Sequence, residues 1–224
     1  MIVPESRFSQ LHVSKERRLR NMRARVDEFA QAVEAAAKAR GDKDPDRQSG
    51  WRRRAKGAET AMQRLRDGKE SRDDKVLAGI EFESLGVDML IVDEAHHFKN
   101  LGVPVASADL GMQLSSAAKC EDLLDKCEWL REAGHGGNIA FMTGTPVSNS
   151  MSELYNMQRY LAPGTLKAQG LDTFAAWAGA YGQVVPTVEL KPEGNGFQVK
   201  QRFARFQNLP ELMNAVKQFT DMIT

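Results

Sequence analysis

The stretch Val87-Asp-Met-Leu-Ile-Val-Asp-Glu-Ala-His96 decides how this chain folds. It begins with a short apolar run, residues 87–92, which ends abruptly in charge at Asp93 and Glu94. Such a pattern is typical of a strand that is buried in a parallel sheet. We therefore expect a strand over residues 87–92, with both carboxylates at its carboxyl end.

The segment that follows predicts a second strand parallel to the first. A helix is expected from about Ser115 to Ala133, and residues 138–142 form another short apolar run. Strand, helix and strand at this spacing make a βαβ unit with a right-handed crossover. The expected fold class is α/β, with ligand chemistry at the carboxyl ends of the strands. The residues expected to face inward from the helix are Cys120, Leu123, Leu124, Cys127 and Leu130.

The flanking segments predict helices and one β-hairpin. Ser14 is the expected N-cap of a helix that runs to about Arg40, and a loop at 41–50 leads to a second helix from Trp51 to Leu65. After the βαβ unit, further elements are expected in three places. The first is a helix that begins with a capping box at Ser150–Glu153 and ends at Pro163-Gly164, and the second is a short helix capped by Asp172. Two strands at 183–190 and 196–203 follow, and a last helix begins near Asn208. We expect three parts: a basic helical hairpin at 1–80, the α/β part at 81–165, and a helix, hairpin and helix at 166–224.

Composition and charge limit the functional classes. Of the 224 residues, 42% are apolar and 27% are charged, which suits a folded domain with a core. No apolar run approaches the roughly 20 residues of a membrane span, and the first 30 residues are too charged for a secretory signal, so a cytoplasmic protein without membrane contact is expected. The net charge of +1 hides an excess of Lys and Arg in the first 80 residues and of Asp and Glu afterwards. A basic front half suits a polyanion partner, and a solvated helix face explains it equally well.

Asp93 and Glu94 carry the expected chemistry. Adjacent side chains at the end of a strand point in different directions, so one carboxylate can hold Mg²⁺ while the other faces a water molecule. Nucleotide hydrolysis needs this division, because the metal neutralises phosphate charge and a base activates the attacking water.

Two motifs resemble those of superfamily 2 helicases. The string Asp93-Glu-Ala-His-His-Phe-Lys-Asn100 is similar to the acidic (DEAH or Walker B) box of Swi/Snf-type DNA translocases, and Met142-Thr-Gly-Thr-Pro-Val-Ser-Asn149 resembles their coupling motif. The segment 80–88 also resembles large phage and plasmid proteins that join such a helicase to an adenine-specific DNA methyltransferase. The resemblance is strong over 80–165 and looser elsewhere.

The resemblance implies an ATP-binding RecA-like lobe that uses ATP and Mg²⁺ and acts on DNA, expected to be double-stranded. Asp93 would hold Mg²⁺ through water, Glu94 would be the base, and His96 would bond to the coupling motif. The residues of that motif which would carry the coupling are Thr143, Gly144, Thr145 and Pro146. Lys99 and Asn100 match the tail of the acidic box, whereas His97 replaces the usual basic residue.

The chain has no P-loop. Its nearest candidate, Gly68-Lys69-Glu70, has Gln63 in place of the first glycine and Glu70 in place of the hydroxyl residue. We therefore expect a fragment, inactive alone, whose partners are the P-loop segment, the second helicase lobe and a methyltransferase domain of a parent polypeptide. The alternatives are a non-catalytic module that binds DNA or protein, a carboxylate-metal nuclease, and a zinc site at His96 and His97.

Overall fold

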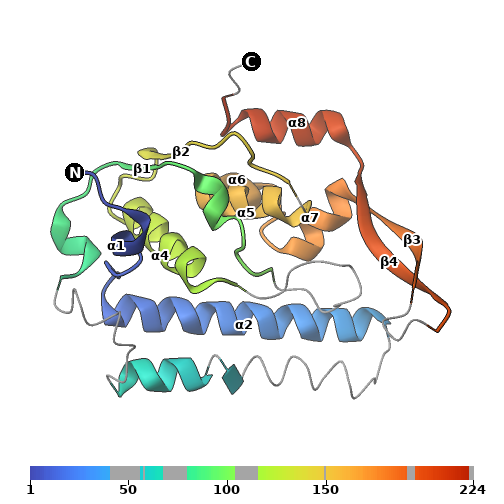
Figure 1. Ribbon diagram of the computed structural model, residues 1–224, viewed down its shortest axis with the longest axis horizontal. Helices are drawn as coiled ribbons and strands as arrows, with labels where there is room; N and C mark the ends of the chain where they lie inside the picture. Colours follow the sequence, from blue (N-terminus) through green and yellow to red (C-terminus); the bar gives the residue numbers. More distant parts are fainter. Residues whose placement is uncertain are drawn as a thin grey trace.

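The computed structural model describes residues 1–40, 56–57, 59–67, 80–103, 116–148, 150–190 and 195–221. Helices, short strands and one long hairpin alternate along the chain (Figure 1). The loop at 41–50, Trp51 and the predicted helix start at Ser115 lie outside the described residues.

The centre of the fold is a pair of parallel strands. Strand β1 (Leu90–Val92) pairs with β2 (Ile139–Phe141) in the register Leu90 with Ile139 and Val92 with Phe141. Helix α4 (Ala118–Glu132) lies between them in the chain, so the strand, helix and strand order is confirmed. Both strands are shorter than predicted. Residues 87–89 lead into β1 without pairing, and β2 lacks one residue at each end of the predicted range. A mixed helix and strand structure with a small parallel sheet is compatible with the α/β class.

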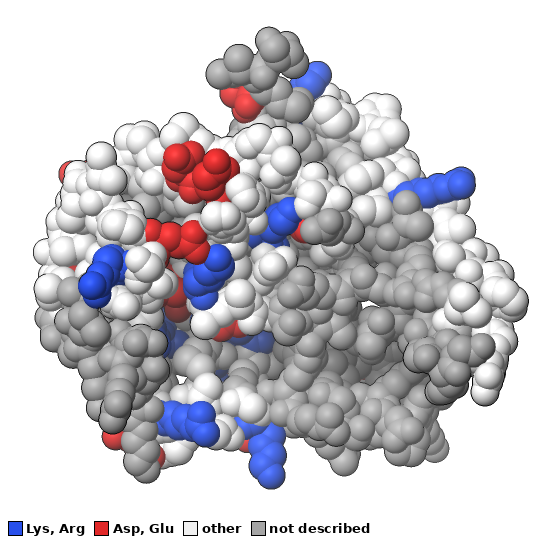
Figure 2. All heavy atoms as spheres, in the orientation of Figure 1, with Lys and Arg blue, Asp and Glu red and all other residues white. Residues whose placement is uncertain are grey.

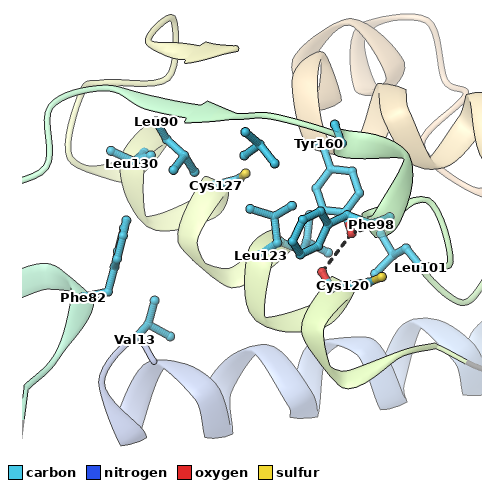
Figure 3. Packing of buried hydrophobic residues seen from close by; sticks show 13 residues of the cluster. Val13, Phe82, Leu90, Phe98, Leu101, Cys120, Leu123, Cys127, Leu130 and Tyr160 are labelled. Carbon is cyan, nitrogen blue, oxygen red and sulfur yellow. Dashed lines mark hydrogen bonds between the residues drawn. The ribbon is translucent and has the colours of Figure 1, made fainter. Parts of the chain in front are cut away.

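The main core lies under one face of this sheet. Helix α4 turns five predicted residues inward, each with at most 4% of its surface exposed: Cys120, Leu123, Leu124, Cys127 and Leu130. They pack against Leu90 and Val92 of β1 and against Phe82 of the 3-10 helix η2 (Phe82–Leu85) (Figure 3). The hydroxyl of Tyr160 lies within hydrogen-bond distance of two backbone oxygens, those of Phe98 at 3.1 Å and Cys120 at 2.9 Å. Cys127 is a core residue, and its burial raises the pKa of the thiol to about 12.

The N-terminal helices pack along α4. Helix α1 (Glu5–Phe8) is one turn long, and α2 (Lys15–Arg40) has the predicted bounds. In Figure 1, α2 runs along the lower side of the molecule beneath α4. Residues 59–66 are helical, with Met62 and Leu65 buried. The ammonium group of Lys15 donates to the backbone oxygen of Arg66 at 3.0 Å, which joins the start of α2 to the end of the second helix, as an antiparallel hairpin requires.

Charge complementarity holds α2 against α4. Arg25 Nη1 donates to Asp125 Oδ1 at 2.6 Å, and the amide of Asn21 reaches the same oxygen at 3.0 Å. About two turns further along α4, Glu132 accepts from Arg17 at 2.6 Å and from Arg20 at 3.1 Å. Basic residues of the first part therefore meet acidic residues of the second.

The next helices form a second core. They are α5 (Ser152–Leu161), α6 (Pro163–Ala168) and α7 (Phe174–Tyr181). The aromatic residues that these helices contribute to the second core are Tyr155, Phe174, Trp177 and Tyr181. Trp177 is fully buried, and its Nε1 donates to Gln158 Oε1 at 2.6 Å.

Two details of the predicted helix caps are wrong. The capping box at the start of α5 does not form, because the N-cap is Met151 and the Glu153 carboxylate accepts from the backbone N–H of Ser148 instead. Helix α5 ends at Leu161 before Pro163, as predicted, and Pro163 also begins α6, where its missing N–H costs nothing. Thr173, not Asp172, caps α7 by accepting from the N–H of Ala176 at 3.3 Å.

A long antiparallel hairpin and a helix complete the chain. Strands β3 (Gly182–Leu190) and β4 (Phe197–Phe206) pair in the register Leu190 with Phe197, with an irregularity between Gln183 and Val184. Of the predicted turn, residues 191–194 lie outside the described part. Helix α8 (Leu209–Lys217) begins after Asn208, as predicted. In the part of the chain that is described, no helix is long and apolar enough to cross a membrane.

Candidate functional site

Asp93 and Glu94 lie at the carboxyl end of β1, and both are exposed. Asp93 Oδ1 accepts a hydrogen bond from the backbone N–H of Glu94 at 2.9 Å, which turns the chain sharply at this point. Glu94 has a φ of 50°, in the left-handed region that side chains other than glycine rarely adopt. A strained non-glycine residue costs about 1 kcal/mol or more and is found disproportionately at functional sites.

The backbone joins the ends of the two strands. Beyond the sheet, Met142 N donates to Val92 O at 2.8 Å, and Ala95 N donates to Met142 O at 3.0 Å. These bonds place Thr143 beside the 3-10 helix η3 (Ala95–Phe98), although 47 residues separate Thr143 from His96. The acidic box and the coupling motif therefore share one edge of the sheet.

His96 connects the two motifs through its side chain. Its Nδ1 lies 3.1 Å from Glu94 Oε2 and 3.4 Å from Thr143 Oγ1. The Thr143 hydroxyl also accepts from the backbone N–H of Thr145 at 3.1 Å, which shapes the turn that contains Gly144 and Pro146. Thr143 therefore meets His96 directly, whereas Thr145 acts on it only through Thr143.

Lys99 forms a second, buried connection between the motifs. Its Nζ donates to Ser148 Oγ and lies 3.4 Å from Glu153 Oε2. The same carboxylate oxygen accepts from Ser148 N at 2.6 Å. Only 12% of the Lys99 side chain and 6% of the Glu153 side chain are exposed. The sequence matched Lys99 to the acidic-box tail without a role, and it predicted Glu153 as part of a helix cap without a link to Lys99.

The side chains at this edge fit a magnesium site with few protein ligands. Mg²⁺ keeps several waters and is often bound through one or two carboxylates and the phosphates of a substrate. The exposed carboxylate of Asp93 suits such water-mediated binding. Among the described residues, no group of three or more His, Cys, Asp or Glu side chains could hold a metal by itself. Figure 2 shows acidic side chains gathered on the upper left of this face, in the region of the strand ends, with basic side chains close by.

His97 points to a different partner. Its Nδ1 lies 2.8 Å from Glu5 Oε2, and the other oxygen of Glu5 accepts from Lys119 Nζ at 2.7 Å. The hydrogen bond from Lys119 is the largest influence that lowers the pKa of Glu5. Nothing in the sequence suggested that Glu5 would reach the acidic box. Asn149, the last residue of the coupling motif, lies outside the described residues.

Comparisons with known proteins give one match. Neither the search of curated proteins nor the search of solved structures found a match. The model of a family described as a probable helicase domain matches residues 1–224, the whole chain. The chain therefore belongs to this family of probable helicase domains.

Proposed function

We propose that the chain is part of the ATP-binding, RecA-like lobe of a Swi/Snf-type DNA translocase. The observation that carries the proposal is the contact of His96 with both Glu94 and Thr143 at the carboxyl ends of two parallel strands. The proposal is supported because these three side chains lie at the edge where parallel sheets bind ligands. Membership of a helicase-related family supports the same reading.

The exposed carboxylates divide the work of hydrolysis. Asp93 would hold Mg²⁺ through water, and the metal would supply charge neutralisation at the phosphates of ATP. Glu94 accepts a proton from the attacking water, which its exposed position at the sheet edge allows. His96 orients the Glu94 carboxylate and also contacts Thr143. A change in position of Glu94 during hydrolysis would therefore be passed through His96 to the turn at 143–146.

Exposed apolar side chains on the outer face of the sheet are evidence that the chain is part of a larger lobe. Met89, Ile91 and Met142 are between 51% and 56% exposed, although parallel sheets are normally covered on both faces. We propose that segments of a parent polypeptide cover this face and supply the P-loop, which the sequence lacks, together with a second helicase lobe. The chain alone is then expected not to hydrolyse ATP.

DNA is the proposed partner of the complete protein, in double-stranded form. The further proposal of a phage or plasmid parent that also carries an adenine methyltransferase rests on the sequence resemblance of residues 80–88, which lead into the acidic box. The chemistry assigned to Asp93 and Glu94 does not depend on the proposed DNA partner or on the proposed parent protein.

The test is ATP hydrolysis by the complete polypeptide that contains this domain. Glu94→Gln keeps the size of the side chain and removes the base, so we expect DNA-stimulated turnover to fall at least about 100-fold. Glu16→Gln, at an exposed glutamate in the first turn of α2, is the matched control and should leave turnover unchanged. Equal turnover of the wild type and Glu94→Gln would reject hydrolysis at this site and favour a non-catalytic module that binds DNA or protein.

A further inference from the structure

Glu5 connects the first helix of the chain to the acidic box. Its two carboxylate oxygens serve two different elements, because Oε2 contacts His97 in η3 at 2.8 Å and Oε1 accepts from Lys119 in α4 at 2.7 Å. The lowered pKa of Glu5 keeps it ionised at neutral pH. The carboxylate of Glu5 therefore connects η3 to α1 and α4 at the surface of the molecule.

The contact continues from His97 to the candidate base. The rings of His97 and His96 meet nearly edge to face, with centroids 4.4 Å apart and planes at 71°. His96 in turn lies 3.1 Å from Glu94 Oε2. An unbroken line of contacts thus runs from Glu5 through both histidines to Glu94.

Local structure does little to fix this segment. Helix η3 is a single 3-10 turn of four residues, and its N-cap, Glu94, makes no capping hydrogen bond with its side chain. Single 3-10 turns have poor hydrogen-bond geometry and rarely hold themselves rigid. Ala95 and Phe98 anchor the buried side of the turn. On its exposed side, among the described residues, Glu5 is the contact that comes from another element to His97.

We propose that Glu5 is a positioning residue, which orients Glu94 for water activation by fixing His97 and through it His96. The assignment rests on the proposed function, since it concerns the same base. Glu5 does not touch the reacting atoms. Its carboxylate limits rotation of the His97 ring, the packed rings limit His96, and His96 holds the carboxylate of Glu94.

Because the pair of Glu5 and His97 is exposed, its effect on the geometry at Glu94 can be measured separately from its effect on stability. The side chains of Glu5 and His97 are 41% and 47% exposed, and exposed ion pairs contribute little to stability. A change at Glu5 should therefore leave the folding of the chain almost unchanged while it alters the geometry at Glu94. Misplacement of a catalytic group by about 1 Å can cost as much as about 100-fold in rate.

The experiment compares Glu5→Ala with Glu16→Ala, a change at an exposed glutamate of α2. In the 224-residue chain, we expect the ring-nitrogen NMR signals of both His97 and His96 to shift in Glu5→Ala and to stay in place in Glu16→Ala. In the complete polypeptide, kcat for DNA-stimulated ATP hydrolysis should fall about tenfold in Glu5→Ala, with KM for ATP changed less than about twofold. His97→Ala removes the same contact from the other side and should reproduce the loss.

Several results would overturn this role of Glu5. Unchanged His96 signals in Glu5→Ala would show that the effect stops at His97, and an unchanged kcat would show that the orientation does not matter. Unfolding of Glu5→Ala would identify a structural residue instead. A fully active Glu94→Gln would reject the proposed function itself, and the NMR comparison would still show whether Glu5 fixes His96.

Discussion

The buried pair of Lys99 and Glu153 should be worth several times more than an exposed pair of the same length. Lys99→Met keeps the length of the side chain and removes its charge, so the carboxylate of Glu153, which is 6% exposed, loses this ion pair. Breaking a buried pair from one side typically costs 3–5 kcal/mol. Here the N–H of Ser148 still donates to that carboxylate at 2.6 Å, so we expect a loss of about 2–3 kcal/mol in the free energy of unfolding.

The reverse substitution should cost less. Glu153→Gln keeps an oxygen that accepts from Ser148 N, and Lys99 keeps its bond to the Ser148 hydroxyl, so a loss of about 1–2 kcal/mol is expected. The double variant should lose less than the sum of the two single changes, with a coupling of about 1–2 kcal/mol. Urea unfolding of the four proteins, with the slope against urea compared between them, measures these values.

The chain contains a matched control for this cycle. Arg23 and Asp27 on α2 are also 3.4 Å apart, but their side chains are 66% and 53% exposed. Arg23→Met should cost less than about 0.5 kcal/mol. If Lys99→Met costs no more than Arg23→Met, or the coupling is zero, the pair does not clamp the acidic box to the coupling motif and the reasoning is wrong.

Three further outcomes are expected. Burial is the main cause that raises the pKa of Glu128, whose carboxylate accepts from Asn21, so its ionised form opposes folding. Glu128→Gln should therefore increase stability by up to about 1 kcal/mol above the folded pKa, and the gain should fade as the pH falls toward the unfolded value, as urea unfolding at several pH values will show. Tyr160→Phe removes a hydroxyl that lies buried between two backbone oxygens and should cost about 1–3 kcal/mol in the same assay. Glu94→Asn suits a φ of 50° better than glutamate and should raise the thermal midpoint by a few degrees while it abolishes ATP turnover of the complete polypeptide. An unchanged or lower midpoint would show that the backbone at this position is not strained.

Local patterns predicted the centre of the fold well. The parallel strands and the inward residues of α4 follow from short-range periodicity, which the sequence displays directly. The nearness of the two motifs also follows from the parallel strands, because their carboxyl ends meet at one edge of the sheet. The bond of His96 to Thr143 was expected only from the resemblance to helicases.

The failures share a physical cause. Ser150 and Glu153 have the spacing of a capping box, but Glu153 bonds instead to Ser148 and to Lys99, which is 54 positions earlier in the chain. Glu5 reaches His97 across 92 positions. Such contacts depend on how whole elements pack, and a single sequence gives no local signal for them. Pro163 fits both the end of one helix and the start of the next, so its position alone did not predict that α6 begins there.

Several basic residues of the front half already have acidic partners within the fold. Among the described residues of α2, Arg17, Arg20 and Arg25 bond to Glu132 and Asp125 of α4, and Arg23 pairs with Asp27. These arginines meet carboxylates already, so contact with DNA phosphates would first have to break those pairs. The buried pair of Arg25 and Asp125 would resist this most, because Asp125 is only 6% exposed and its loss of a partner would be costly. A DNA-binding module built on this face of α2 would therefore compete with its own fold. For Arg17, Arg20 and Arg25, docking of α2 on α4 is accordingly a better explanation than a polyanion site.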